Sequence, residues 1–177
     1  MNDLLYWFII IFMIHEFEEF IFFPGWLQKN KNRLADRFPK LSKYTLNKMG
    51  NISTSAFALA VFEEYVIVIL ITASAIYFDF YGLWTGMFTA FSIHLIIHII
   101  QWLIIRKYVP FIVTSILCLP YCIYVFNILI TTQNTDYKTI VFWTIVGIVA
   151  TGLNLLFAHK IAIIFDKRFT KKNNYTE

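Results

Sequence analysis

The chain has 177 residues, of which 59% are hydrophobic and 15% charged, and its mean hydropathy is +0.64. A soluble domain of this size needs more polar residues to cover its surface. The formal net charge is +4, but the basic residues sit beside long apolar stretches, a distribution that orients a membrane protein rather than one that binds nucleic acid. These properties argue against a soluble domain and a nucleic-acid partner, and they predict an integral membrane protein.

Apolar stretches of the length needed to cross a bilayer, about 20 residues of helix, recur along the chain. They cover residues 4–23, 52–78, 83–105, 109–132 and 140–165. The N-terminus has no basic region and no small-residue cleavage site, so we expect the first stretch to be retained rather than removed as a signal peptide. The sequence therefore predicts an all-α fold, with residues 1–177 forming one transmembrane domain of about five helices.

The basic residues predict the orientation of this bundle. Lysine and arginine resist translocation and collect on the cytoplasmic side. With the N-terminus outside and the C-terminus cytoplasmic, only Lys138 of the 15 lysines and arginines lies outside. The others fall in residues 24–51, after the third stretch, and near the C-terminus.

The loop of residues 24–51 combines these cations with apolar side chains such as Trp26 and Phe38, and Pro39 interrupts it. Two short interfacial helices would fit this pattern, with aromatics buried and cations facing an anionic inner leaflet. The alternative is a solvated cytoplasmic loop. With the interfacial helices, and with the apolar spans, membrane lipids are the expected partners of the chain.

The ionisable residues His15, Glu18 and Glu19 interrupt the first apolar stretch. Each costs about 2.5–3.5 kcal/mol near the centre of a bilayer on insertion scales. Their spacing places them on neighbouring positions of one helix face. Such residues are expected to face other helices, to pair with one another, or to bind a cation.

Two later stretches carry ionisable residues at a similar depth. Glu63 and Glu64 lie in the second stretch, where adjacent residues differ by about 100° and only one is expected to face the first helix. His94 and His98 lie one turn apart in the third stretch, with Gln101 on the same stripe. With the orientation above, all three groups lie between the midplane and the inner half of the bilayer.

Imidazoles and carboxylates at one depth are the ligands of zinc, non-haem iron and manganese. We expect one or two divalent ions, with candidate ligands drawn from three helices. These are His15, Glu18, Glu19, Glu64, His94 and His98, and the candidate catalytic residues are Glu19, Glu63 and Glu64. The alternatives are a metal-free acid–base or proton-relay network and a purely structural network.

The segment His15–Glu16–Phe17–Glu18–Glu19 resembles the motif of the HXXEE-motif family, a group of small bacterial integral-membrane proteins without settled activity. The resemblance implies that His15, Glu18 and Glu19 belong to a site and that the protein lies in a bacterial cytoplasmic membrane. It assigns no role to Glu16. A metalloprotease HExxH motif is absent because position 19 is Glu, and four histidines are too few for the histidine boxes of membrane desaturases.

These features predict a metal-dependent membrane enzyme that acts on a lipid or another apolar substrate. Histidines and glutamates would hold the ion, and an unligated glutamate would move a proton. One alternative is a proton- or cation-coupled transporter or channel, which at this size would require a homo-oligomer. Another is a metal-free isomerase with His and Glu as acid and base. The sequence does not identify the substrate.

Overall fold

The computed structural model describes residues 2–39, 52–131 and 136–170, and every regular element within these ranges is helical. The elements are α1 (Asn2–Arg37), α3 (Thr54–Phe78), α4 (Gly82–Ile105), α5 (Ile112–Thr131), α6 (Tyr137–Phe165) and the short π-helix η1 (Asp166–Thr170). The predicted all-α class is confirmed.

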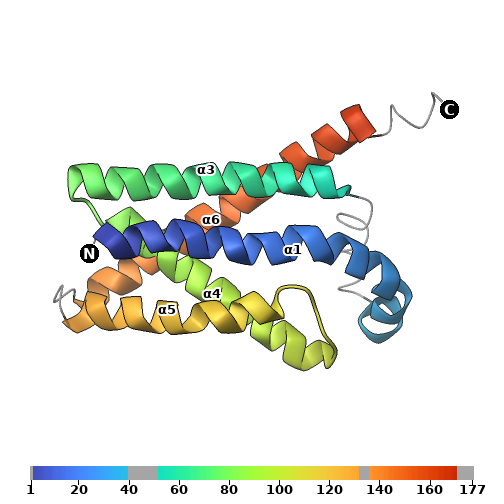
Figure 1. Ribbon diagram of the computed structural model, residues 1–177, viewed down its shortest axis with the longest axis horizontal. Coiled ribbons are helices and arrows are strands. Elements are labelled where there is room, and N and C mark those ends of the chain that lie inside the picture. Colours follow the sequence, from blue (N-terminus) through green and yellow to red (C-terminus); the bar gives the residue numbers. More distant parts are fainter. Residues whose placement is uncertain (1, 40–51, 132–135, 171–177) are drawn as a thin grey trace.

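The helices form a bundle in which one face of α1 packs against other helices and the opposite face is exposed. In Figure 1, α1 runs between α3 and α5, while α4 and α6 cross behind these three at an angle. Helix α4 packs against both α5 and α6, and α3 packs against α1 and α6. The polar face of α1 therefore lies inside the bundle.

Four helices are long and apolar enough to cross a membrane: α3, α4, α5 and the combined segment Tyr137–Phe169. Helices α3 to α6 begin and end within three residues of the predicted stretches 52–78, 83–105, 109–132 and 140–165. These lengths and compositions are those of an integral membrane protein. Helix α1 is not among the four, because Glu16, Glu18 and Glu19 fall within its apolar stretch.

The structure differs from the sequence prediction after residue 23. A loop was expected over residues 24–51, but α1 continues through Pro24 to Arg37. Proline removes one backbone hydrogen bond and bends a helix without necessarily ending it, and in Figure 1 the last turns of α1 bend away from its axis. The extension is held by the indole of Trp26, which donates to the carbonyl of Tyr108 at 2.9 Å, and by Arg37. Residues 40–51, including the rest of this loop, lie outside the described residues.

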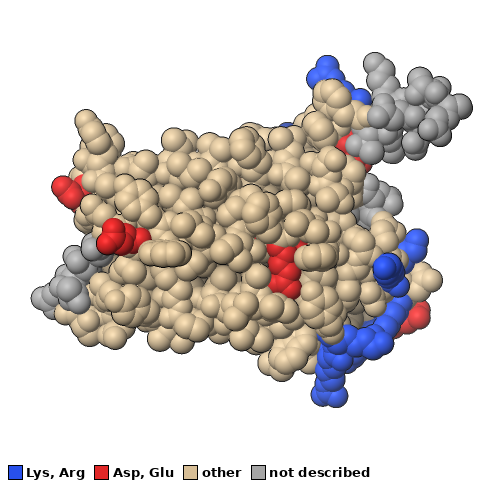
Figure 2. Space-filling model, viewed as in Figure 1, with Lys and Arg blue, Asp and Glu red and all other residues tan. Residues whose placement is uncertain are grey.

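Most of the basic residues that the structure describes collect at one end of the bundle (Figure 2), and Lys138, at the start of α6, is the exception. The guanidinium of Arg37 donates to the carbonyls of Ile105 and Ile104 at 2.9 and 3.1 Å, which ties the end of α1 to the end of α4. At the same end, the backbone N–H of Ser53 donates to Asp166 at 3.2 Å, which joins the start of α3 to the end of α6. Basic segments that are far apart in the sequence therefore lie together at one end of the structure.

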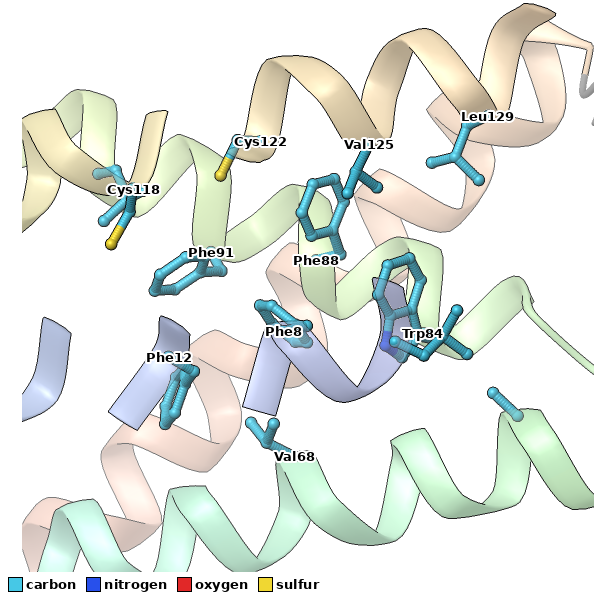
Figure 3. Close-up of a cluster of buried hydrophobic side chains, with 13 residues drawn as sticks. Phe8, Phe12, Val68, Trp84, Phe88, Phe91, Cys118, Cys122, Val125 and Leu129 are labelled. Carbon is cyan, nitrogen blue, oxygen red and sulfur yellow. The ribbon is translucent and has the colours of Figure 1, made fainter. Parts of the chain in front are cut away.

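An aromatic core fixes α1 against α4 and α5 (Figure 3). Phe8 is fully buried and makes edge contacts with Trp84, Phe88 and Phe91 of α4, with ring centroids 5.4–5.6 Å apart. Cys118 and Cys122 of α5 extend this core, and both are buried and free of a disulfide. The core leads directly to His15, whose ring lies 5.7 Å from that of Phe91.

Helices α4 and α6 approach so closely at one crossing that only glycine fits. A Cβ atom placed on Gly147 would clash with the backbone carbonyl of Gly86, and one on Gly86 would clash with the carbonyl of Trp143. Small residues allow such backbone contact between membrane helices. This crossing sets the position of α6 over the face of α4 that carries His94.

Candidate metal centre

Four of the predicted ligands converge in the interior of the bundle. His15 and Glu19 come from successive turns of α1, and His94 and His98 from successive turns of α4. One ligand atom from each residue lies within 4.8 Å of all the others. His15 and His98 are buried, while the side chain of His94 is 41% exposed. Two i, i+4 pairs on facing helices therefore build one cluster.

The histidine rings are held so that their Nε2 atoms face this cluster. His15 Nδ1 lies 2.9 Å from the hydroxyl of Thr114, and that hydroxyl gives its own proton to Glu18 at 2.6 Å, so the ring must donate through Nδ1. His98 Nδ1 lies 3.0 Å from Gln101 Oε1, which can only accept. In the neutral form of each ring the Nε2 lone pair is left free for a ligand.

The donor atoms lie close enough together to surround a metal ion, for which the two α4 histidines would have to move apart from their present contact. His15 Nε2 is buried and has no hydrogen-bond partner among the described residues. His98 Nε2 lies 2.7 Å from His94 Nε2 and 3.3 Å from Glu19 Oε2, and His94 Nε2 lies 3.8 Å from that oxygen. Donors bound at about 2.1 Å to a tetrahedral ion are about 3.4 Å apart. A cation among these atoms would satisfy the buried Nε2 and neutralise Glu19.

The structure places Glu18 outside the ligand group. Its Oε2 accepts from the backbone N–H of Thr114 at 2.8 Å and from the Thr114 hydroxyl, and its Oε1 accepts from Tyr108 at 3.3 Å. Burial and the adjacent Glu18 carboxylate raise the pKa of Tyr108, so this phenol stays protonated and continues to donate. Glu18 therefore orients Thr114, and Thr114 orients His15. Such outer partners fix the ring and tautomer of a metal-binding histidine.

The two adjacent glutamates of α3, Glu63 and Glu64, have different partners, as their separation of about 100° around the helix predicted. Glu63 accepts a hydrogen bond at 3.2 Å from Asn154 of α6. Glu64 lines the cavities beside the cluster but is not one of the four convergent ligands. The candidate catalytic roles of Glu63 and Glu64 stay predictions.

Sequence reasoning missed Glu16, which follows His15 directly. Glu16 is only 6% exposed, although it lines the same two cavities as Glu64. The signal was available: Glu16 lies one helical turn before Glu19 and so shares its face. The family motif drew attention to the flanking positions instead.

Two apolar cavities adjoin the cluster. One, of about 340 Å³, lies among α1, α3, α4 and α6, and the other, of about 620 Å³, extends toward the basic end of the bundle. Their shared lining residues are Glu16, Glu64, His94 and Leu155. His159, at the C-terminal part of α6, lines the larger cavity. The cluster thus has access to space large enough for a ligand.

The Thr114 hydroxyl is expected to set metal affinity through His15. Thr114→Val removes the acceptor for His15 Nδ1 and the donor to Glu18, so the affinity for zinc should fall about 10–100-fold. Thr114→Ser keeps the hydroxyl and should restore most of the affinity. Competition with a chelating dye measures both variants. Equal affinities of Thr114→Val and Thr114→Ser would show that the hydroxyl does not act through the ring.

Comparison with known proteins places this chain in a family. Residues 6–125 match the family described as a protein of unknown function with HXXEE motif. The match covers more than half of the chain, and the chain belongs to the HXXEE-motif family, as the motif at His15 predicted. No curated protein and no solved structure is significantly similar to it. The family assignment brings no substrate or activity with it.

Proposed function

We propose that this protein is a membrane-embedded, metal-dependent enzyme that acts on a lipid or another apolar substrate. One observation carries the proposal: four ligand atoms from α1 and α4 converge beside two largely apolar cavities inside a bundle of membrane-spanning length. A purely structural network would not require a buried, unpartnered nitrogen at its centre. Nor would it require free space beside the histidines.

The residues divide into two roles. His15, His94, His98 and Glu19 would hold the ion, and three imidazoles with one carboxylate suit zinc, iron or manganese. When bound, such an ion supplies a Lewis acid that polarises a substrate oxygen or a water molecule. Glu16 and Glu64 lie outside the ligand group and line the cavities, where a carboxylate can accept a proton from a bound substrate.

The proposal includes the orientation in the membrane. We place the basic end of the bundle, where α1, α4 and α6 end, at the cytoplasmic face of a bacterial membrane, with the N-terminus outside. Helix α1 then forms a fifth span. Its glutamates avoid the lipid because Glu16 and Glu18 are buried between helices. The substrate would reach the site from the inner leaflet.

The experiment that tests this function is metal analysis by mass spectrometry on detergent-purified protein that has not met a chelator. We expect about one equivalent of zinc, iron or manganese per chain, lost in His15→Ala. Cys118→Ala, which changes a buried α5 residue outside the ligand group, is the control and should keep its metal. Wild-type protein without metal, or equal metal content in both variants, would overturn the proposal.

A metal-free acid–base enzyme, such as an isomerase, is the second candidate. The observation that favours it is the pair of carboxylates, Glu16 and Glu64, on the wall of both cavities. One of them in its protonated form and one ionised would supply an acid and a base at the same substrate. Purified protein with no metal but with a retained lipid would favour this function over the first.

A further inference from the structure

The two cavities follow one helix on either side of the metal centre. Leu83, Met87 and Ala90 of α4 line the smaller cavity, and Gln101 and Ile105 line the larger one. His94 lines both. The two spaces share the side chains of Glu16, Glu64, His94 and Leu155, so they adjoin beside the cluster, and a flexible ligand that displaced these side chains would extend from one into the other.

The length of this path suits a long hydrocarbon chain. At about 1.5 Å per residue, His94 lies roughly 16 Å along α4 from Leu83 and roughly 16 Å from Ile105. The walls are mostly apolar in both directions, and their glutamates and most of their other polar residues lie near the cluster. A volume of about 340 Å³ for the inner space is near the lower limit of ligand pockets, which favours a single chain over a two-chain lipid.

The path is positively charged where the larger cavity reaches the basic end of the bundle. Trp26, Leu34, Phe38 and Ile105 line the larger cavity and also a small surface hollow that contains Arg37. The guanidinium of Arg37 uses two of its donors on the carbonyls that end α4, and it is exposed, so its charge remains available to an anion at this rim. An anionic head group at Arg37 would leave its chain directed inward.

We propose that the two cavities bind one single-chain anionic amphiphile of the fatty-acid type, with its head group beside Arg37 and its chain passing the metal centre into the smaller cavity. This inference rests on the proposed function and deepens it, because it places a methylene roughly 16 Å down the chain, rather than the head group, at His15, Glu19, His94 and His98. The enzyme would therefore act on a position within the chain.

The test is the binding of radiolabelled palmitate and octanoate to purified protein in detergent, measured by scintillation proximity. Ala150 is an exposed residue of α6 that also lines the smaller cavity, so Ala150→Phe should fill the inner end without disturbing the core. We expect this variant to bind palmitate at least about tenfold more weakly, because the end of the chain loses apolar contact, and to bind octanoate as the wild type does.

Val149→Phe is the matched control, because Val149 is 57% exposed and lines neither cavity. It should bind both acids as the wild type does. Arg37→Gln keeps a donor for the α4 carbonyls but removes the charge, so it should weaken palmitate about threefold or more and leave hexadecanol unchanged. Equal palmitate affinity in Ala150→Phe and Val149→Phe would overturn the inference.

Metal analysis of the same samples separates this inference from the proposed function. Protein that holds its metal but shows no saturable palmitate binding would overturn the chain-binding path and leave the metal centre in place. Palmitate binding that depends on Ala150, in protein without metal, would support the path and contradict the metal-dependent function.

Discussion

Glu19→Gln is expected to abolish metal binding, whereas Glu18→Gln is expected only to weaken it. The Oε2 atom of Glu19 lies 3.3 Å from His98 Nε2 within the ligand group, so its charge compensates the ion directly. A neutral amide oxygen supplies no such charge, and affinity should fall by more than about a hundredfold. Glu18 accepts from Thr114 and Tyr108 instead, and Glu18→Gln should cost about tenfold.

The two variants control each other, since they make the same chemical change at neighbouring motif positions. Zinc affinity by chelator competition and metal content after purification are the measurements. The reverse order, with Glu18→Gln losing the ion and Glu19→Gln keeping it, would contradict a ligand set that contains Glu19 and leaves Glu18 outside. Equal losses would leave no basis for separating the two motif glutamates into ligand and support.

The helical spacing of the sequence was enough to bring His15, Glu19, His94 and His98 together, because i, i+4 pairs on two helices at equal depth have few ways to face each other. It did not separate Glu18 from Glu19. That difference depends on where α5 packs: the α5 residue Thr114 lies beside α1 and takes the Glu18 carboxylate. A partner 96 residues away leaves no trace in the local pattern.

The continuation of α1 was missed for a related reason. A proline such as Pro24 between an apolar stretch and a basic segment is typical of a span that ends. Nothing local shows that Trp26 binds the loop after α4 or that Arg37 binds the C-terminal end of α4. Those contacts hold the C-terminal part of α1 against the end of α4 and the loop that follows it. The spacing of Glu16 and Glu19 could have placed Glu16 on the same helix face, but the cavities that Glu16 lines depend on the packing of α3 and α6 against α1 and α4.

In the proposed orientation, these ionisable groups would lie within the bilayer, where the low dielectric constant affects their chemistry. In a low-dielectric interior, a Glu19 carboxylate that faces only neutral imidazoles is costly, whereas an ion with a carboxylate and three neutral imidazoles would need no water to stabilise it. The same exclusion of water strengthens the polarisation of a substrate next to the ion. Under the proposed function, the apolar cavities would therefore serve both the binding of an apolar substrate and the strength of the metal centre.

Gly147→Ala is expected to destabilise the protein, although alanine is the better helix former by about 1 kcal/mol. The added methyl would meet the Gly86 carbonyl, a backbone atom that cannot rotate away, so α6 would have to move off α4. Overpacking of this kind costs about 1–3 kcal/mol, and more where backbone is displaced. Thermal unfolding in detergent should show a clear fall in Tm.

Gly152→Ala provides the matched control, since a Cβ atom at this α6 position would meet nothing within 4 Å. Helix propensity then acts alone, and Gly152→Ala should be neutral or slightly stabilising. A Tm of Gly147→Ala equal to that of Gly152→Ala would show that α4 and α6 are not in close contact at this crossing. Because α6 also supplies Ala150 and Leu155 to the cavity walls, its displacement in Gly147→Ala should weaken palmitate binding before the four ligands on α1 and α4 lose their metal.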